Sequence, residues 1–219
     1  MIFVNFKTYQ EGTGELAVSL VKTLESVAEE SQVKIIPVVQ ATDVKEIVAL
    51  TRLEVWVQKV DAFDFGAHTG AILPEAVLED GAVGTFINHS EAKISDFDEL
   101  TKVVKRADEV GLKTLVFASN VAELERVAGL NLTFVAYEPA ELVGSRDTSV
   151  AQAKPEVISQ AYEILRAKGI PLVVGAGIKS SEDVRKSVEL GAVGVAVASD
   201  IVLAKNPKEE LLNLISGFE

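Results

Sequence analysis

The sequence contains no cysteine and only two histidines, His68 and His89, among its 219 residues. Without cysteine, neither a disulfide framework nor a thiolate metal site can form. Two histidines are also too few for a histidine-based metal cluster. We therefore expect no metal site in this protein.

Basic residues and long apolar runs are scarce as well. The chain has 21 Lys and Arg against 33 Asp and Glu, a formal net charge of −12. Nucleic-acid binding needs clustered Lys and Arg, so we expect none, and an anionic substrate must be held by local donors. The longest apolar runs, such as residues 192–198, fall short of the roughly 20 residues that span a bilayer. Residues 1–7 lack the basic start of a signal peptide, so we expect no membrane partner and a cytoplasmic protein.

What the sequence does contain is a regular alternation of short apolar runs and amphipathic segments. The pattern predicts strands at residues 2–4, 33–39, 55–57, 82–87, 114–117, 133–137, 171–174 and 193–198, with helical segments between them and after the last. Continuously apolar strands indicate a parallel sheet buried on both faces. Eight such units without a linker predict one α/β domain over residues 1–219, a (β/α)8 barrel. A doubly wound open sheet is the alternative, but it would normally have a glycine-rich turn after its first strand.

Glu138 directly follows the apolar run 133–137, and Pro139 comes next. In a barrel of this kind the reacting groups lie at the carboxyl ends of the strands. Partial burial there raises the pKa of a carboxylate towards neutrality, which suits proton transfer. A structural glutamate that caps the strand end or pairs with a lysine is the alternative.

Two further strand ends carry polar side chains. Asn5 and Lys7 follow the first strand, and their spacing predicts that both point the same way in an extended backbone. His89 follows the fourth strand, where Ser90 would cap a short helix whose positive end keeps the imidazole neutral. A solvated lysine and a satisfied structural histidine remain open as alternatives.

Small residues follow the seventh and eighth strands, at Gly175, Gly177 and Ser199. Turns at these two positions form the usual phosphate site of this barrel, because their backbone N–H groups converge on the anion. The segment 139–147 after Glu138 is long for a compact domain. It is either a functional lid or a passive connector.

Together these motifs resemble the triosephosphate isomerase family, particularly its short archaeal-type branch, over the whole chain. The motifs are Asn5-Phe6-Lys7, Asn88-His89-Ser90-Glu91, Tyr137-Glu138-Pro139 with the lid 139–144, Gly175-Ala176-Gly177 and Ala198-Ser199. The resemblance implies a TIM barrel that interconverts dihydroxyacetone phosphate and D-glyceraldehyde 3-phosphate in glycolysis and gluconeogenesis, without a cofactor.

The resemblance also implies roles for individual residues. Glu138 would take the proton next to the substrate carbonyl and return it to the neighbouring carbon, while neutral His89 polarises the carbonyl. Lys7, assisted by Asn5, would balance the charge of the phosphate and the enediolate, and Glu91 would support this group from behind. The backbone amides expected to hold the phosphate are those of Val143, Gly177, Ala198 and Ser199.

Residues 66–70 resemble the family's third loop, which inserts into a neighbouring subunit. The resemblance therefore implies a homodimer or homotetramer in which Thr69 touches the active site of the partner. For His68 we expect an interface or solvent role.

Three positions depart from the family pattern. Gln58-Lys59 stands in place of Gln-His, the lid continues as Ser145-Arg146-Asp147 without a second glycine, and Asp200 occupies a position that is usually glycine. A carboxylate beside a phosphate dianion is repulsive unless it turns outward or pairs with a cation. Two other functions stay open: an isomerase of a larger sugar phosphate, and a catalytically silent paralogue that binds a phosphorylated ligand or serves as an assembly subunit.

Overall fold

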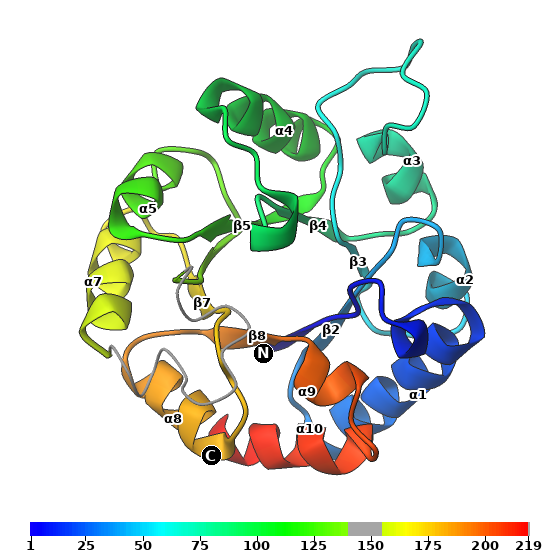
Figure 1. The fold of residues 1–219 in the computed structure, drawn as a ribbon, viewed down its shortest axis with the longest axis vertical. Coiled ribbons are helices and arrows are strands. Elements are labelled where there is room, and N and C mark those ends of the chain that lie inside the picture. Colours follow the sequence, from blue (N-terminus) through cyan, green and yellow to red (C-terminus); the bar gives the residue numbers. More distant parts are fainter. Residues whose placement is uncertain (140–154, 219) are drawn as a thin grey trace.

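In the computed structural model, residues 1–139 and 155–218 are described, and they contain eight parallel strands that close into a barrel surrounded by helices (Figure 1). The strands are β1 Ile2–Asn5, β2 Ile35–Val39, β3 Trp56–Val57, β4 Gly84–Ile87, β5 Lys113–Ala118, β6 Phe134–Tyr137, β7 Leu172–Val174 and β8 Gly194–Val197. Each strand pairs with the next, and β8 pairs with β1 through the register Ile2↔Val195. The (β/α)8 barrel is confirmed, and this closure excludes the open doubly wound sheet.

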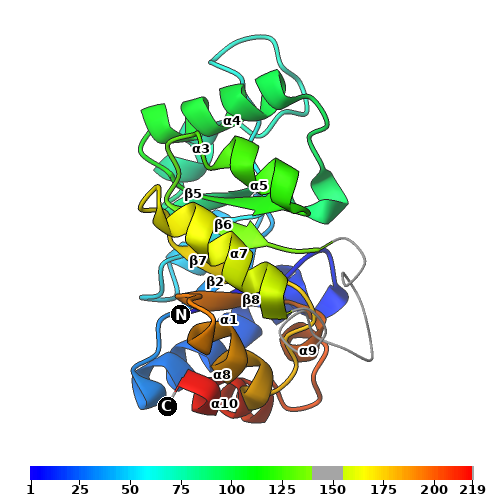
Figure 2. The same ribbon diagram turned by 90° about the vertical axis from the view of Figure 1, so that its left-hand side faces the viewer.

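Helices follow the strands and pack around the outside of the barrel (Figures 1 and 2). They are α1 Gly14–Ser31, α2 Val44–Val48, α3 Pro74–Glu79, α4 Phe97–Glu109, α5 Val121–Val127, α7 Pro155–Arg166, α8 Ser181–Glu189, α9 Ser199–Val202 and α10 Pro207–Ile215. Short 3-10 turns lie at η1 Gln10–Gly12, η2 Ser90–Ala92 and η4 Ser216–Phe218. No helix in the described part of the chain is both long and apolar enough to cross a membrane.

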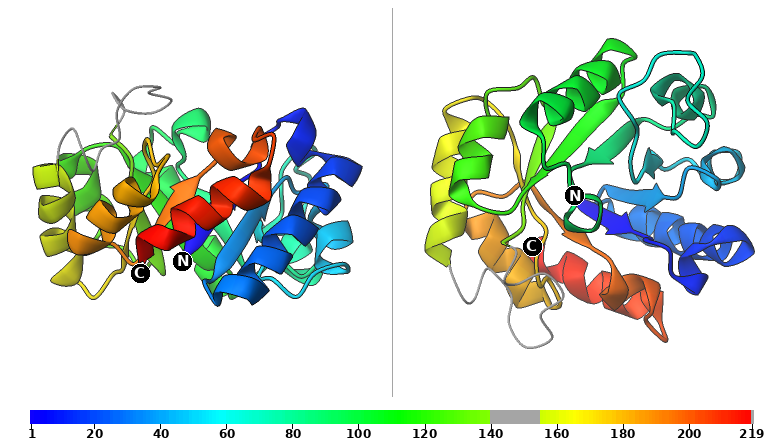
Figure 3. Two further views of the ribbon diagram at one scale, coloured as in Figure 1. Left: turned by 90° about the horizontal axis from the view of Figure 1, so that it is seen from below. Right: turned by 45° about the horizontal axis from the view of Figure 1, so that its top comes forward.

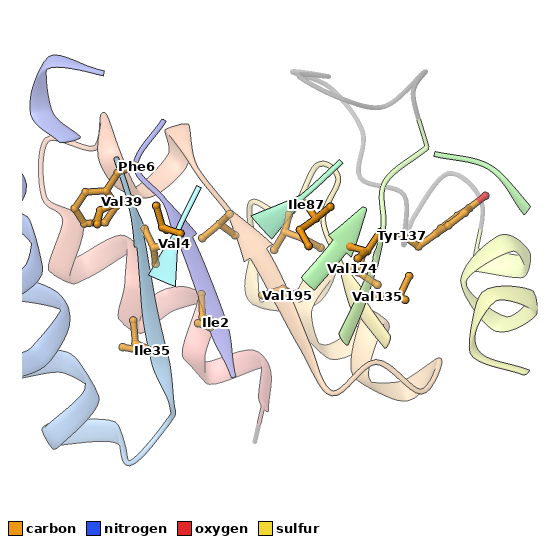
Figure 4. Close-up of a cluster of buried hydrophobic side chains, with 14 of the residues drawn as sticks. Ile2, Val4, Phe6, Ile35, Val39, Ile87, Val135, Tyr137, Val174 and Val195 are labelled. Carbon is orange, nitrogen blue, oxygen red and sulfur yellow. The ribbon is translucent and has the colours of Figure 1, made fainter. Parts of the chain in front are cut away.

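Side chains of each strand alternate between two cores, as the two-residue period of a strand requires. Ile2 and Val4 of β1 point outward to the helices, in the layer drawn in Figure 4. Phe3, between them, points into the barrel, where its ring meets Trp56 edge-on at 5.1 Å between centroids. Trp56 is fully buried, and among the described residues its indole N–H has no hydrogen-bond partner. The inner layer is therefore an aromatic plug that closes the barrel below its carboxyl end.

Local sequence explains where the helices begin. Asp96 accepts the N–H of Asp98 at the start of α4, and Ser180 and Asp183 form a capping box at the start of α8. The apolar face of α4 turns inward at helical spacing, through Leu100, Val103, Val104 and Ala107. These caps and faces fix the helices against the barrel, so the loops at its carboxyl end have rigid supports.

The two rims of the barrel carry different features. The left panel of Figure 3 shows both chain ends at the lower rim and α9 near the upper rim. In Figure 1 the loop between β3 and α3 projects away from the barrel. The upper rim, where the strands end, is where the candidate site lies.

Candidate active site

A cavity of about 570 Å3 opens at the carboxyl ends of the strands. It draws its lining from segments that follow β1, β4, β6, β7 and β8, as expected for this barrel. The candidate residues that line it are Asn5, Lys7, His89, Glu138, Gly177, Ala198 and Ser199, joined by Asp200. The structure thus brings together seven of the ten candidate residues, although they lie up to 194 positions apart in the sequence.

Lys7 reaches the cavity from a turn and not from an extended strand, so the expectation of one extended Asn5–Lys7 segment is wrong. Its backbone is left-handed, with φ of 48°. Two side chains hold this conformation: Asn5 Oδ1 accepts the Lys7 N–H at 3.0 Å, and Gln58 Nε2 donates to the Lys7 carbonyl at 2.8 Å. Lys7 Nζ forms an ion pair with Glu91 Oε1 at 2.8 Å. Glu91 therefore holds the Lys7 ammonium group in place.

His89 is a buried, neutral imidazole whose tautomer follows from its contacts. Burial lowers the pKa of His89 to about 4, with Glu91 acting against the shift and Lys7 adding to it. Its Nδ1 accepts the backbone N–H of Glu91 at 3.2 Å, so the ring proton lies on Nε2. His89 is thus itself the cap of η2, which corrects the expectation that Ser90 would be. Burial, and not a helix end, is the main reason that the ring stays uncharged.

Glu138 is 6% exposed and follows β6 directly. Burial raises the pKa of Glu138 to about 7, while a hydrogen bond from Ser90 and the positive charge of Lys7 oppose the shift. Within the described residues, Oε2 of Glu138 is buried without a hydrogen-bond partner. A carboxylate with a pKa near neutrality can both accept and return a proton under ordinary conditions.

Phe117 and Gly175 lie in the contacts that link His89 to Glu138. The Phe117 ring stands edge-on to His89, with centroids 4.8 Å apart at 80°. A Cβ on Gly175 would lie 3.4 Å from Phe117 and 3.5 Å from Glu138 Oε1, so the residue that follows β7 lies beside both side chains. Lys7 acts electrostatically on both His89 and Glu138. The Glu138 carboxylate, the His89 imidazole and the Lys7 ammonium group therefore face one shared cavity.

Gly177, Ala198 and Ser199 line the same cavity after β7 and β8. Gly177 has φ of 69°, a backbone conformation that residues other than glycine rarely adopt. Asp200 also lines the cavity, is exposed, and forms no ion pair within the described residues. Among residues 1–139 and 155–218, no salt bridge neutralises the charge of Asp200.

Three candidates lie elsewhere. Glu91 is not part of the cavity lining and reaches the site through Lys7. Thr69 is exposed on the projecting loop, away from this cavity. Val143 lies outside the described residues, and so does the lid variant Ser145-Arg146-Asp147.

Sequence reasoning missed two supporting side chains, Gln58 and Ser90. Gln58 was noted only as part of a departure from the family pattern, yet it holds the Lys7 carbonyl across 51 positions of sequence. Ser90 was expected to cap a helix, yet it acts on Glu138. No signal within one sequence could have revealed either contact.

Over residues 1–139 and 155–218, no cluster of three or more His, Asp or Glu side chains could hold a metal ion.

Comparison with known proteins identifies the family. The family model described as triosephosphate isomerase matches residues 1–217. Triosephosphate isomerase from Methanobacterium bryantii is 42% identical over 99% of this chain and 96% of that protein. The enzyme from Methanopyrus kandleri is 41% identical over 100% of this chain and 97% of its own length. The crystal structure of triosephosphate isomerase from Bartonella henselae shares the fold, with a TM-score of 0.76 at 17% identity over 99% of this chain and 96% of that one. The chain therefore belongs to the triosephosphate isomerase family.

Proposed function

We propose that this protein is an active triosephosphate isomerase, which interconverts dihydroxyacetone phosphate and D-glyceraldehyde 3-phosphate. The observation that carries the proposal is Glu138, a buried carboxylate with a pKa of about 7 in a cavity shared with a neutral imidazole. Such a pair can move a proton between two adjacent carbons without a metal or a redox cofactor. Family membership gives the substrate.

The reaction begins with removal of a proton from C1 of dihydroxyacetone phosphate. Glu138 takes this proton, and the electron pair of the C–H bond forms the C1–C2 double bond of an enediolate. The same carboxyl group then delivers a proton to C2, which gives the aldehyde at C1. Nothing is oxidised or reduced overall: one proton moves from C1 to C2, a second moves from the C1 oxygen to the C2 oxygen, and the double bond shifts from C2–O to C1–O.

His89 and Lys7 stabilise the charge that develops on oxygen. The Nε2–H of His89 donates to the carbonyl oxygen, and neutral imidazole can pass protons between the two oxygens of the enediolate. Lys7 supplies positive charge, and Asn5 assists as a neighbouring amide. In the free enzyme Glu91 holds the Lys7 ammonium group, so its position is already set before substrate arrives.

The phosphate is the remote handle of the substrate. Gly177, Ala198 and Ser199 contribute the N–H groups that hold it, together with Val143 from beyond the described part of the chain. Binding energy from this end can orient the reacting carbons and contribute to the chemical step. Asp200 faces the same end and works against it electrostatically.

A coupled assay of glyceraldehyde 3-phosphate formation tests the proposal. Replacement of Glu138 by Gln keeps the shape of the side chain and removes the base, so turnover should fall by roughly 10²- to 10⁴-fold. The exposed Glu125 of α5 is the matched control, since Glu125→Gln changes the same charge far from the cavity. Near-normal turnover of Glu138→Gln would overturn the assignment.

A cytoplasmic location, where glycolysis and gluconeogenesis run, completes the proposal and is tested by cell fractionation.

We also propose that the protein works as a homodimer or homotetramer in which residues 66–70, on the loop between β3 and α3, enter a second copy. Phe63 and Phe65 on this loop are 41% and 77% exposed, which is a large apolar surface for a projecting loop. The Phe63 ring stacks on His68 at 4.2 Å between centroids, so the loop keeps a defined shape. Thr69 at its tip would contact the active site of the partner.

The base of this loop is tied to the barrel by Arg106 of α4. Arg106 forms ion pairs with Asp64 of the loop at 3.0 Å and with Glu75 of α3. Sedimentation velocity over a range of protein concentrations tests the assembly. Phe65→Asp should dissociate it, because a charge would be buried at the contact, and Glu125→Gln should not. A wild-type protein that sediments as a monomer at all concentrations would refute it.

A further inference from the structure

Asn88, which precedes His89, has a backbone conformation that needs support. Its φ is 62°, in the left-handed region that residues other than glycine adopt at an energetic cost. The residue is also 2% exposed, so its amide group must find partners within the protein. Those partners explain how the segment after β4 is held.

The Asn88 side chain connects the far end of the loop that carries His89 to β5 and α5. Its Oδ1 accepts the N–H of Ile94 at 2.9 Å and so closes the segment 89–93. Its Nδ2 donates to the Phe117 carbonyl of β5 at 2.8 Å and to Glu123 Oε1 at 2.8 Å. The loop is therefore attached to the next strand and to the first turn of α5.

Glu123 binds the far end of the same loop through Lys93. Lys93 Nζ donates to Glu123 Oε2 at 2.8 Å, and Ser119 donates to that oxygen twice, through its N–H and its Oγ, each at 2.8 Å. Burial of Glu123 raises its pKa, but the bonds from Lys93, Ser119 and Asn88 outweigh this effect and lower it. The carboxylate stays charged, and the residues on either side of the loop, Asn88 and Lys93, meet at it.

The imidazole depends on the shape of this loop. His89 Nδ1 accepts the N–H of Glu91 within the loop, while the His89 ring packs on the edge of Phe117, whose carbonyl holds Asn88. A change in the path of residues 89–93 would alter both contacts together. The tautomer and the direction of Nε2–H therefore follow from how the loop is anchored.

We propose that Glu123 is the positioning residue of His89: through Asn88 and Lys93 it fixes the loop so that Nε2–H points at the substrate. Glu123 does not line the cavity, so it acts only through other residues. The inference rests on the proposed role of His89 in the isomerase reaction. It adds a site on α5, outside the cavity, that controls the electrophile.

Two variants test the anchor by different routes. Glu123→Gln keeps the shape but removes the charge that binds Lys93. Asn88→Gly accepts the left-handed backbone without strain and removes the three side-chain bonds. We expect kcat to fall roughly 10- to 100-fold for each, with KM within about twofold, because a small misplacement of the electrophile affects the transition state more than binding. Glu125→Gln, two residues along α5, is the matched control and should retain wild-type kcat.

Imidazole NMR with 15N-labelled histidine reads the ring directly. The chain has only two histidines, so His68 on the projecting loop serves as an internal reference. In the wild type His89 should show the single Nε2–H tautomer between pH 5 and 8. In Glu123→Gln and Asn88→Gly we expect a mixture of tautomers, with His68 unchanged. The charges that act on the ring, Glu91, Lys7 and Lys93, are present in both variants.

The outcomes separate this inference from the proposed function. Unchanged His89 signals in both folded variants, with or without a loss of kcat, would overturn the anchoring role. Normal turnover of His89→Gln would instead overturn the catalytic role of His89, whatever the ring signals show. If Glu123→Gln does not fold, Lys93→Gln removes the same ion pair from a side chain that is 37% exposed, and it carries the same two readouts.

Discussion

Replacing Glu138 with Gln should stabilise the protein while it lowers turnover. The carboxylate is buried, and Oε2 lacks a partner within the described residues, so its charged form is poorly solvated in the folded state. An amide of the same shape carries no charge at any pH. The variant therefore removes a cost that the functional enzyme bears whenever Glu138 is ionised.

The size of this cost follows from the pKa of Glu138, which burial raises from 4.5 to about 7. The folded protein then binds the Glu138 proton more tightly than the unfolded chain does. The contribution of this proton to the free energy of unfolding is therefore complete below pH 4.5 and is lost as the pH rises through 7. A difference of about 2.5 units corresponds to about 3 kcal/mol. Glu138→Gln should thus match the wild type near pH 4.5 and exceed its free energy of unfolding by about 3 kcal/mol at pH 8.5.

Urea unfolding followed by far-ultraviolet circular dichroism, at one protein concentration and at several pH values, measures this difference. Other titrating groups, including His89, change the free energy of unfolding with pH in both proteins alike, so their contributions cancel in the comparison. Glu125→Gln, on the exposed face of α5, should show no comparable pH-dependent gain. The reasoning would be refuted if Glu138→Gln gained less than about 1 kcal/mol at pH 8.5, or gained as much at pH 4.5.

Three further outcomes are expected. In initial-rate measurements from pH 5 to 9, kcat/KM should rise with a midpoint near pH 7, because Glu138 must be ionised and His89, with a pKa of about 4, titrates below this range; a midpoint near 4.5 would contradict the burial effect. Asp200→Asn should lower KM for the triose phosphates and the inhibition constant of inorganic phosphate by roughly three- to tenfold, whereas unchanged constants would mean that this carboxylate turns away from the phosphate. Gly84→Ala should lower the free energy of unfolding by about 1–3 kcal/mol, because its Cβ would lie 2.5 Å from the Trp56 ring; Gly129→Ala, which meets only a backbone oxygen at 3.4 Å, is the control for urea unfolding.

The fold could be predicted from sequence because each strand is mostly apolar. All four residues of β1, β4 and β8 are buried, and their apolar residues occupy both faces of the strand instead of alternating with polar ones. The helical segments were equally clear, since α4 repeats its apolar residues at helical spacing. The bounds differ by one or two residues at several ends; for instance, the strand expected from residue 33 begins at Ile35.

The candidate site was predictable in its members but not in its local geometry. Glu138, His89 and Lys7 were found because they follow strands and match family motifs. The left-handed turn at Lys7 was missed, because it depends on a bond from Gln58, which is distant in sequence. The cap at His89 was assigned to the wrong residue for a similar reason: the His89 ring nitrogen, and not the Ser90 side chain, accepts a free N–H of η2. The position of a residue after a strand predicts that it reaches the site. Its backbone conformation, in contrast, depends on contacts with residues that are distant in sequence.

The position of Trp56 makes it an intrinsic fluorescence probe of the barrel interior. This residue is the only tryptophan of the chain, it is fully buried inside the barrel, and its ring lies edge-on to Phe3 and tilted against Phe134. Its fluorescence emission therefore senses water entering the barrel interior and ignores fraying of the outer helices. Comparing its emission with the helical dichroism signal during unfolding would reveal whether the inner cylinder opens before, with or after the surrounding shell.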